Sequence, residues 1–462
     1  MSSIPSNVGT VVERIDTLVI LGAGGDLTSR LLLPGLASYL GSSKGKTLNL
    51  IGVDRGELTD AEWRKRVVGA FSAETSALAK SVAGASRYLK ADVTSAVDLE
   101  RVLAEAKGRV AFYFALPPAV TILAVTTLAT MTLPKGITFA LEKPFGTDLA
   151  TARSLNRLLE TMLPEEQLFR VDHFLGKATV LNLLGLRFAN RIFEPLFSAP
   201  NVEKVEIVFD ETLALENRAG YYDRAGALVD MIQSHLLLVL ALTAMEPPAS
   251  LDADDLRGAM AQVLRATRLE KKNGRSSRRA RYGAGTIDGR KLPSYVSEDG
   301  VDPKRATETL AEITLDIDNW RWAGVPFILR SGKALGDMRQ DILITFKPVP
   351  HLPTGLKGVP GASCLRISLK PATLELDLII NGEGDPFVLE RNVLHSDLGA
   401  GELSAYGEVL AGILECDPTL SVRGDVAEEC WRIVGPVLDA WRKNTVPLEE
   451  YPAGTSGPES WG

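Results

Sequence analysis

The sequence predicts an α/β fold in two domains: a doubly wound parallel sheet, followed by a large mixed sheet that carries helices. Three observations support this prediction. The chain has 462 residues, which is too many for one hydrophobic core. The N-terminal third alternates strand-like and helix-like segments, as parallel sheets require. From residue 171 on, segments that alternate apolar and polar residues become frequent, which is typical of half-exposed antiparallel strands. We therefore expect one domain over residues 1–170 and a second over residues 171–462.

The first domain begins with the strand-like run TLVILGAGG, which leads into the helix-like run DLTSRLLLPGLASYL. A second strand (LNLIGVDR), a second helix (TDAEWRKRVVGAF) and two further strands (RVAFYFALPP and GITFALEKPF) follow in order. In an open parallel sheet, ligands bind where the carboxyl ends of the strands meet. The segments GAGGDL, VDR, ALPP and EKPFG all fall at such ends, so we expect the ligand site of this domain to be built from them.

The second domain is expected to contain helices around residues 176–197 and 224–244. Four runs have the alternation of half-exposed strands: VEKVEIVFDETLA, ETLAEITLDIDNW, DILITFKP and CLRISLKPATLELDLII. Residues 270–295 are rich in Gly, Ser and Arg, which predicts an exposed loop with a solvated basic surface. The final run, YPAGTSGPESWG, also predicts a loop.

Composition and charge exclude several classes of protein. Hydrophobic residues make up 45% of the chain and charged residues 24%, which are globular values. A formal net charge of −7 gives no reason to expect nucleic acid or an anionic membrane as partner. The N-terminal segment lacks the basic region of a secretory signal, and no apolar run reaches transmembrane length without a polar interruption. The cysteines have no CxxC or metal-ligand spacing, so we expect a cytoplasmic enzyme with reduced thiols and without a metal centre: Cys364, Cys416 and Cys430.

Three glycines, Gly22, Gly24 and Gly25, lie between the first strand and the first helix. Glycine at this place lets a phosphate approach the backbone, and the helix N-terminus favours its negative charge. The match to G-x-G-x-x-G is incomplete, because Leu27 stands where the third glycine would be. Taken alone, the loop is explained equally well as an ordinary tight turn.

Asp54 and Arg55 end the second strand, where dinucleotide enzymes bind the adenosine ribose. An arginine there can bind a 2′-phosphate, and an aspartate can accept a hydrogen bond from a 2′-hydroxyl. Because both residues are present, the choice between NADP and NAD as cofactor stays open. The alternative is a surface ion pair, which we weigh equally.

The segment RVDHFLGKATVLNLLGLRFAN, residues 170–190, places Asp172, His173 and Lys177 within six residues, just before a helix N-terminus. Such a helix end attracts anions through its free N–H groups and its dipole. The alternative is a solvated helix start, in which Asp172 caps the helix and Lys177 faces water. The segment alone favours this alternative.

The run AGALVDMIQSHLLLVLALTAM predicts a buried helix whose polar exceptions include Asp230, Gln233, Ser234 and His235. A buried imidazole needs hydrogen-bond partners and can titrate near neutral pH, as a general base must. The alternative is a hydrogen-bonded core histidine without a catalytic role, which the helix alone favours.

Two lysines lie at the ends of predicted strands. Lys333 falls in a glycine turn in PFILRSGKALG, and Lys143 precedes a proline in ITFALEKPFG, where the peptide bond can be cis. Each alone is consistent with a surface lysine. Together with Lys177 they supply the three cations that a phosphorylated polyol would need.

These segments together resemble one known family. RVDHFLGK closely resembles the signature of glucose-6-phosphate dehydrogenases, commonly R-I-D-H-Y-L-G-K. The resemblance continues in the family's order over almost the whole chain, through GAGGDL, ALPP, EKPFG, ENRAGYYDRAGALVDMIQSHLL, AMEPP, IDNWRWAGVPFILRSGKAL, WRIVGPVLDAW and YPAG. It implies an α/β Rossmann-like N-terminal domain that binds a dinucleotide. It also implies an α+β C-terminal domain with a large, mainly antiparallel sheet for substrate binding and oligomerisation.

The resemblance implies oxidation of glucose 6-phosphate at C1 to 6-phosphogluconolactone, a step of the oxidative pentose phosphate pathway. His235 would be the general base that takes the proton of the C1 hydroxyl, and Asp172 would orient it. His173 and Lys177 would hold the sugar phosphate. The matching positions for the sugar hydroxyls are Glu211, Asp230 and Lys333, and Lys143 would reach both substrate and cofactor.

The implied cofactor is NADP, with NAD as the alternative. Arg55 matches the arginine that binds the 2′-phosphate. The residues expected at the dinucleotide are Gly22, Gly24, Gly25, Asp26, Leu27, Arg55 and Lys143. The implied partners are a sugar phosphate and further copies of the chain, as a homodimer or homotetramer, with neither nucleic acid nor membrane.

Several positions depart from the family's pattern. Phe174 replaces a tyrosine, and Gly24 replaces a serine or threonine. Leu31 occupies a position where the family usually has a lysine, and Lys370 occupies one often held by glutamine. Met338 occupies a position where the family has a lysine or arginine, although Arg339 is adjacent. These changes leave two alternatives: a paralogue that oxidises another anionic hexose derivative, and a catalytically degenerate relative that binds a sugar phosphate. A dehydrogenase of a non-phosphorylated sugar ranks lower, because His173 and Lys177 would then lack their anion.

Overall fold

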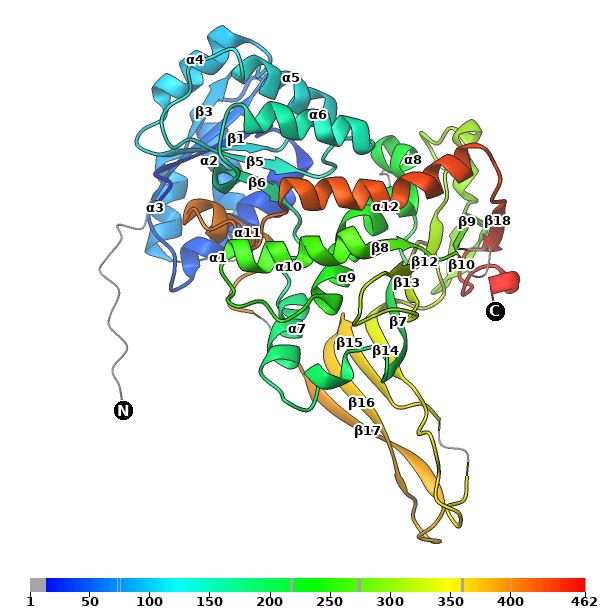
Figure 1. Cartoon of the computed structure of the whole chain (residues 1–462). Helices are drawn as coiled ribbons and strands as arrows, with labels where there is room; N and C mark the ends of the chain where they lie inside the picture. Colours follow the sequence, from blue (N-terminus) through cyan, green and yellow to red (C-terminus); the bar gives the residue numbers. More distant parts are fainter. Residues whose placement is uncertain are drawn as a thin grey trace, which may run out of the picture. The chain divides into compact units, whose positions relative to one another are not determined.

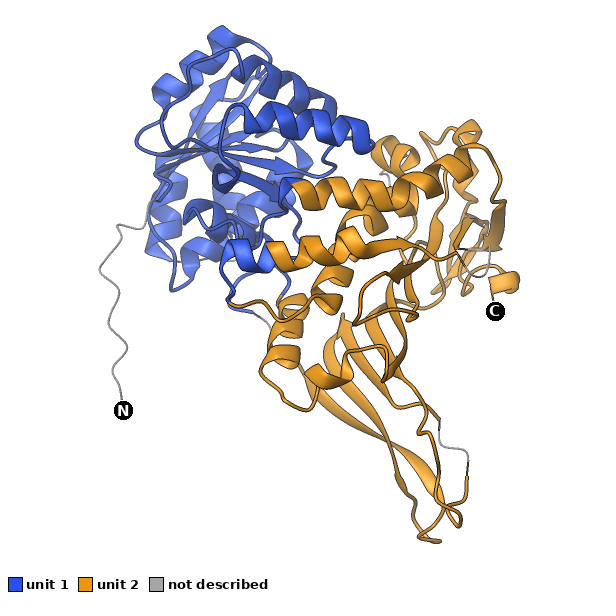
Figure 2. Ribbon diagram, viewed as in Figure 1, with its two compact units in different colours: residues 1–177, 250–257, 401–424 blue, residues 178–249, 258–400, 425–462 orange. Residues whose placement is uncertain are grey.

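The computed structural model describes residues 14–72, 74, 76–216, 219–271, 276–358, 361–399 and 401–461. The expectation that the chain lacks a secretory signal rests partly on residues 1–13, which lie outside these ranges. The chain forms two compact units (Figure 2). Unit 1 comprises residues 1–177, 250–257 and 401–424, and unit 2 comprises residues 178–249, 258–400 and 425–462. The domain boundary at residue 170 stays a proposal, and unit 1 also draws on two segments from much later in the chain.

Unit 1 is built on a six-stranded sheet in the order β3-β2-β1-β4-β5-β6, and all its strand pairs are parallel. This confirms the predicted doubly wound sheet. The strands are β1 (Thr17–Leu21), β2 (Asn49–Asp54), β3 (Arg87–Lys90), β4 (Val110–Phe114), β5 (Thr138–Glu142) and β6 (Leu168–Val171). The strand order reverses between β1 and β4, which is the point where such sheets bind ligands.

Helices cover both faces of this sheet (Figure 1). One set packs with β1 and β2 in a single hydrophobic core: α1 (Leu33–Gly41), α2 (Asp60–Ala70), α3 (Ala77–Ala85) and α11 (Ala405–Leu414). The other set is α4 (Ala96–Glu105), α5 (Pro118–Leu128) and α6 (Leu149–Glu160). The run from residue 26 to the end of α1 is the predicted first helix, with a π-helical turn at Thr28–Leu32.

Unit 2 contains a ten-stranded sheet whose main path is β17-β16-β15-β14-β7-β13-β12-β9-β18, with β8 paired to β12. Its pairs are antiparallel except β7 with β13 and β9 with β18, so the large, mainly antiparallel sheet is confirmed. The strands are β7 (Val202–Asp210), β8 (Thr267–Leu269), β9 (Ser277–Gly283), β12 (Leu310–Ile317), β13 (Phe327–Gly332), β14 (Arg339–Phe346), β15 (Cys364–Leu369), β16 (Ala372–Asn381), β17 (Leu389–Asp397) and β18 (Leu448–Pro452).

The helices of unit 2 include a long apolar stretch that runs from α8 (Ala219–Ala227) through a π-helical segment (Leu228–Leu236) to α9 (Leu237–Ala244). Among the described residues, only this stretch is long and apolar enough to cross a membrane, and 89% of its 18-residue apolar window is buried inside the protein, as in a core helix. Unit 2 also contains α7 (Ala178–Phe188) and most of α10 (Ala253–Ala266) and α12 (Gly424–Arg442), whose first residues belong to unit 1.

The prediction of a loop at residues 270–295 is wrong where the structure describes this stretch. Strand β9 lies inside the large sheet, and β10 (Gly285–Ile287) and β11 (Arg290–Leu292) form a separate hairpin. The arginines misled the prediction because they are paired within the sheet instead of solvated. Arg279 is buried and donates to the side chain of Asn444 at 2.9 Å, and Arg278 contacts Glu312.

The predicted C-terminal loop is also partly wrong, because Tyr451 and Pro452 belong to β18. The segment CLRISLKPATLELDLII forms two strands, β15 and β16, and the cis Lys370–Pro371 bond lies in the turn between them.

Candidate functional site

The glycine loop of unit 1 is shaped by a close approach between two strand ends. Gly22 has φ +93°, and a Cβ there would lie 2.2 Å from the carbonyl oxygen of Ala115, just after β4. Only glycine fits this position. The Gly22 N–H donates to the Val53 carbonyl at 2.8 Å, and the Gly25 N–H donates to the Gly22 carbonyl at 3.0 Å. The loop is therefore a tight turn whose first residue, Gly22, must be glycine.

Asp54 at the end of β2 holds this loop from the side. Its Oδ2 accepts a hydrogen bond from the Gly24 N–H at 2.8 Å, and its Oδ1 accepts one from the Arg55 N–H at 2.7 Å. The sequence left open a surface ion pair between Asp54 and Arg55, but backbone N–H groups, and not the Arg55 guanidinium, hold the Asp54 carboxylate. The Arg55 side chain is exposed beside it.

These strand ends enclose a pocket of about 340 Å³. Gly22, Gly25, Asp54 and Arg55 line it from β1 and β2. Asp92 lines it from the end of β3, and residues 115–117 from the end of β4. Its position at the reversal of strand order and its volume suit the adenosine part of a dinucleotide. Asp26 and Leu27 follow at the start of the helix, where Asp26 is exposed and pairs with Arg30 at 3.3 Å.

Lys143 follows β5, and its bond to Pro144 is cis, as the sequence allowed. The preceding residue, Glu142, accepts a hydrogen bond from the Tyr113 hydroxyl at 2.5 Å and another from Tyr406. Removal from solvent raises the pKa of Glu142 to about 7, although the two tyrosine hydrogen bonds and Lys143 oppose this rise. A carboxyl group that titrates near neutrality therefore lies beside Lys143.

The segment RVDHFLGK begins on β6 with Arg170, which is fully buried. Its guanidinium donates to Glu165 at 2.8 Å and to Asn156 at 3.1 Å. Its backbone N–H donates to the Ser421 hydroxyl at 3.0 Å, and its carbonyl accepts from the Val422 N–H at 2.9 Å. The first residue of the motif is thus a structural anchor that joins residues 401–424 to the edge of the sheet.

After β6 the chain turns, and Asp172 accepts a hydrogen bond from the Phe174 N–H at 2.9 Å. Asp172 is buried, so it does not cap a solvated helix as the alternative for this segment required. Lys177 places its ammonium 3.6 Å from the centre of the Phe174 ring. The missing tyrosine hydroxyl therefore leaves an aromatic face that still holds the lysine.

His173 is held by a residue far along the sequence. Its ring stacks on Tyr406 of α11, with centroids 5.4 Å apart and planes 14° apart. The same helix supports the turn, because a Cβ on Gly176 would lie 2.4 Å from the Ala405 carbonyl oxygen. The N-terminus of α11 therefore forms the wall behind the predicted phosphate site.

In unit 2, the structure brings Glu211 and Lys333 together at the ends of the adjacent strands β7 and β13. Lys333 Nζ donates to Glu211 Oε2 at 2.7 Å. The Lys333 ammonium also lies 5.3 Å from the centre of the Tyr222 ring, and the Tyr451 hydroxyl donates to the Lys333 carbonyl at 2.6 Å. This lysine is therefore part of a built cluster and not a solvated surface lysine.

Asp230 and His235 lie in the π-helical segment Leu228–Leu236, and both are buried as predicted. His235 is 2% exposed. Burial raises the pKa of the Tyr222 hydroxyl well above its usual value, and the negative charge of Asp230 adds to this rise. The charge of Asp230 therefore affects the pKa of Tyr222, the same tyrosine whose ring lies near the Lys333 ammonium.

Glu308 holds the beginning of this segment. Its Oε1 accepts a hydrogen bond from the Leu228 N–H at 3.0 Å. Gly226 has φ +67°, and a Cβ there would lie 2.2 Å from the same carboxylate oxygen. The glycine therefore leaves the room that Glu308 occupies, and Glu308 fixes where the helix with His235 begins.

The remaining departures from the family's pattern lie on the surface. Leu31 is 43% exposed and Met338 44% exposed, and Lys370 is exposed at the turn between β15 and β16. Arg339, next to Met338, is committed elsewhere, because it pairs with Asp341 at 3.1 Å and with Glu206 at 3.4 Å. It does not stand in for the missing cation at position 338.

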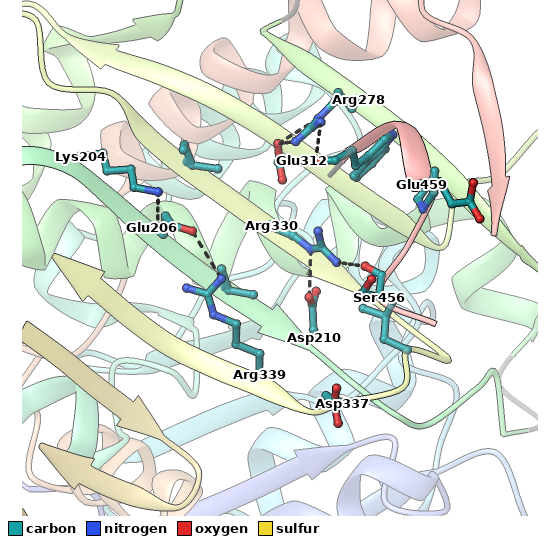
Figure 3. A pocket seen from close by; sticks show the side chains of 15 residues that line it. Lys204, Glu206, Asp210, Arg278, Glu312, Arg330, Asp337, Arg339, Ser456 and Glu459 are labelled. Carbon is teal, nitrogen blue, oxygen red and sulfur yellow. Dashed lines mark hydrogen bonds and ion pairs between the residues drawn. The ribbon is translucent and has the colours of Figure 1, made fainter. Parts of the chain in front are cut away.

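Unit 2 also has a polar depression of about 760 Å³ over the large sheet, and none of the predicted site residues line it (Figure 3). Its cations already have carboxylate partners. Arg330 pairs with Asp210 at 2.9 Å, and Lys204 pairs with Glu206 at 2.8 Å. Burial raises the pKa of Asp210 to about 6, against the lowering effect of Arg330.

Sequence reasoning missed the residues that support the site from a distance. Tyr406 and Glu308 lie in ordinary-looking segments, and only the fold brings them to His173 and Leu228. Glu142 lies in the segment EKPFG, but no local sequence pattern predicts that tyrosines donate hydrogen bonds to it.

Comparisons with known proteins agree with this description. Residues 19–182 match the model of the glucose-6-phosphate dehydrogenase NAD binding domain, and residues 184–461 match the model of the glucose-6-phosphate dehydrogenase C-terminal domain. The chain is 36% identical to the glucose-6-phosphate 1-dehydrogenase of Treponema pallidum, covering 98% of this chain and 94% of the relative. It is 37% identical to that of Rhizobium meliloti, covering 97% and 95%.

Two solved structures are similar over the same extent. The crystal structure of glucose-6-phosphate 1-dehydrogenase from Mycobacterium avium has a TM-score of 0.84 and 34% identity, covering 97% of this chain and 96% of the other. A glucose-6-phosphate dehydrogenase in complex with its substrate glucose-6-phosphate has a TM-score of 0.85 and 28% identity, with the same coverage. Together with the dinucleotide-binding fold of unit 1, these matches show that the chain is an oxidoreductase that belongs to the glucose-6-phosphate dehydrogenase family.

Proposed function

We propose that the protein oxidises glucose 6-phosphate at C1 to 6-phosphogluconolactone, with transfer of a hydride to NADP. The observation that carries this proposal is a match over nearly the whole chain to relatives named glucose-6-phosphate 1-dehydrogenase. The family-matched catalytic and phosphate-site residues Asp172, His173, Lys177 and His235 are all present. The relatives' names favour this substrate over another anionic hexose derivative, and the retained residues argue against a degenerate sugar-binding relative.

His173 and Lys177 bind the phosphate of the substrate. Two cationic or hydrogen-bonding groups on one short turn suit a dianion, and each has an aromatic neighbour that limits its movement. Binding energy at the phosphate, far from the reacting carbon, fixes C1 in position for the chemistry.

Glu211, Asp230 and Lys333 bind the sugar hydroxyls, and Lys143 contacts both substrate and cofactor. The ion pair between Glu211 and Lys333 supports this role, because it holds one acceptor and one donor at a fixed separation of 2.7 Å. A hydroxyl both donates and accepts hydrogen bonds, so a site of this kind recognises it in one orientation.

His235 is the general base. Its imidazole nitrogen takes the proton of the C1 hydroxyl, the C1–H bond breaks with its electron pair, and a C1=O bond forms in the lactone. Bound NADP supplies the acceptor for that hydride at C4 of its nicotinamide. Asp172 stabilises the imidazolium that results, which is the role of the carboxylate in other histidine–carboxylate pairs.

Gly22, Gly24, Gly25, Asp26, Leu27, Arg55 and Lys143 hold the dinucleotide. The cradle at Gly22, which leaves no room for a side chain, supports binding of its phosphates, and the exposed Arg55 supports binding of a 2′-phosphate.

A homodimer or homotetramer in the cytoplasm completes the proposal. Strands β16 and β17 carry several exposed apolar side chains, which is typical of a surface that another copy covers: Ile380, Val393 and Leu394. The three cysteines are thiols and not disulfides, as a reducing compartment would leave them.

The experiment that tests the phosphate site compares Lys177→Ala with a control, Lys65→Ala, at an exposed lysine of α2. We expect Lys177→Ala to raise the KM for glucose 6-phosphate by about tenfold or more, because a charge-assisted hydrogen bond contributes ~1.5–3 kcal/mol. The KM for the dinucleotide and any rate on free glucose should change little. An equal loss on phosphorylated and free sugar would contradict the assigned role.

A further inference from the structure

We propose that Asp54 determines the dinucleotide preference of this chain: its carboxylate accepts hydrogen bonds from the adenosine ribose hydroxyls of NAD, so that NAD is used alongside NADP. The inference rests on the proposed function in one respect, the assignment of the pocket of unit 1 to a dinucleotide. Three observations at the ends of β1, β2 and β3 support it: the hydrogen bonds that fix Asp54, the steric fit between Asp54 and Gly24, and the charges around the pocket.

Asp54 is held in place by the backbone on both sides. Oδ2 accepts from the Gly24 N–H at 2.8 Å and Oδ1 accepts from the Arg55 N–H at 2.7 Å, while the side chain lines the pocket. A carboxylate can accept about four hydrogen bonds, so each oxygen keeps capacity for one more. Two neighbouring hydroxyls, such as the 2′- and 3′-hydroxyls of a ribose, are the complementary ligand. An aspartate at the end of the second strand is the usual partner of a ribose 2′-hydroxyl in this class of sheet.

Gly24 and Asp54 are matched to each other. A Cβ on Gly24 would lie 2.7 Å from Asp54 Oδ2, which is closer than a real Cβ approaches an oxygen. The backbone of Gly24 does not have the positive φ that would itself require glycine. The reason for glycine at this position is therefore the carboxylate. The replacement of the family's serine or threonine by Gly24 and the presence of Asp54 form one feature.

This feature removes two donors that a 2′-phosphate could use. Position 24 has no hydroxyl, and the Gly24 N–H already donates to Asp54. The charges around the pocket include the carboxylates of Asp54 and Asp92 and the guanidinium of Arg55. Arg66, a further cation close to this loop, donates to the Ala23 carbonyl at 3.1 Å. A 2′-phosphate would gain from Arg55 but be repelled by Asp54, whereas a 2′-hydroxyl meets no such conflict.

The test measures dissociation constants of NAD and NADP for the whole protein by titration calorimetry, in the absence of sugar, together with initial rates. The wild-type protein is expected to bind both. Asp54→Ala should weaken NAD by about tenfold or more, because hydrogen bonds to a charged group are lost, and should leave NADP unchanged or tighter. Asp54→Asn keeps the shape of the side chain and one acceptor, so its dissociation constant for NAD should lie between those of the wild-type protein and Asp54→Ala. Arg55→Ala is the matched control and should weaken NADP much more than NAD.

Gly24→Ser tests the pairing of the two residues. In the wild-type background its Cβ should displace the Asp54 carboxylate and weaken NAD. In the Asp54→Ala background the same serine should be tolerated and should strengthen NADP. The effects on NAD binding should therefore be far from additive. A thermal unfolding curve for each variant checks that the loop change does not unfold the protein.

Two results would overturn the inference: NAD binding that Asp54→Ala leaves within twofold, or an equal loss of NAD and NADP, which would indicate damage to the loop. Failure of the proposed substrate is a separate result. If glucose 6-phosphate gives no turnover with either dinucleotide, the calorimetric preference between NAD and NADP still tests Asp54.

Discussion

At the residue scale, the replacement of the family's tyrosine by Phe174 removes a hydroxyl, but the Lys177 side chain is still held in position. The phenylalanine cannot donate a hydrogen bond, yet its ring lies 3.6 Å from the lysine ammonium and is itself buried. Such a contact contributes ~0.5–2 kcal/mol, enough to restrict a long side chain. The sequence alone shows the lost hydroxyl, whereas the compensating contact needs the turn that the Asp172 carboxylate stabilises.

His235 is the residue on which the chemistry depends most. We expect His235→Asn to abolish turnover while the dissociation constant of glucose 6-phosphate stays within a few-fold, because a base is lost but the phosphate site is kept. Equilibrium binding of the sugar phosphate and the single-turnover rate of nicotinamide reduction measure the two effects separately. If binding fell as severely as turnover, His235 would be a ligand of the substrate and not its base.

At the scale of elements, α11 and the π-helical segment Leu228–Leu236 place their functional side chains through distant partners. Tyr406 on α11 stacks on His173, and Glu308 receives the Leu228 N–H. Hydrophobic periodicity predicted the helix that carries His235, and the sequence analysis placed His173 just before a helix N-terminus. Neither predicted these partners, because the contacts join segments that are 233 and 80 residues apart in the sequence.

The ring of Tyr406 should matter more than its hydroxyl. Tyr406→Leu is expected to raise the KM for glucose 6-phosphate several-fold, because a stacked aromatic pair contributes about 0.5–1.5 kcal/mol. Tyr406→Phe keeps the stack and should stay close to wild type, and the KM for the dinucleotide should not change in either variant. Steady-state kinetics with each substrate varied in turn provides the measurement. Equal effects of leucine and phenylalanine would instead assign the role to the hydroxyl and its partner Glu142.

Glu308 should make stability depend on pH. Burial raises the pKa of this carboxyl from its usual value of 4.5 to about 7, although the Leu228 N–H and Arg279 oppose the rise. Between those values the folded protein keeps a proton that the unfolded chain has lost, so this group contributes less stability as the pH rises from about 4.5 to about 7. Glu308→Gln keeps an acceptor for Leu228 but cannot ionise.

The melting temperature of Glu308→Gln relative to wild type should therefore increase as the pH is raised across that range. Thermal unfolding of both proteins at matched pH values gives this difference directly, and other titrating groups cancel in it. A difference that stays constant with pH would show that Glu308 is already ionised in the folded protein at low pH.

At the scale of the whole molecule, the sequence predicts the fold class well because hydrophobic alternation reports which faces of strands and helices are buried. It fails for β9, where Arg278 and Arg279 look like solvated loop residues but are paired inside a sheet. It also cannot show that residues 401–424 join unit 1, since the ties to Arg170 run through a backbone pair and a serine hydroxyl. Such contacts leave no periodic signal in the chain.

The measurement that tests the proposed activity most directly is an initial-rate panel with the purified protein. It crosses glucose 6-phosphate, galactose 6-phosphate, glucosamine 6-phosphate and free glucose with NADP and NAD. We predict that glucose 6-phosphate gives the highest kcat/KM by a wide margin, which would mean that Leu31, Met338 and Lys370 are tolerated surface changes. A clear rate on another sugar without turnover of glucose 6-phosphate, or tight binding of glucose 6-phosphate without reduction of either dinucleotide, would contradict the proposed activity.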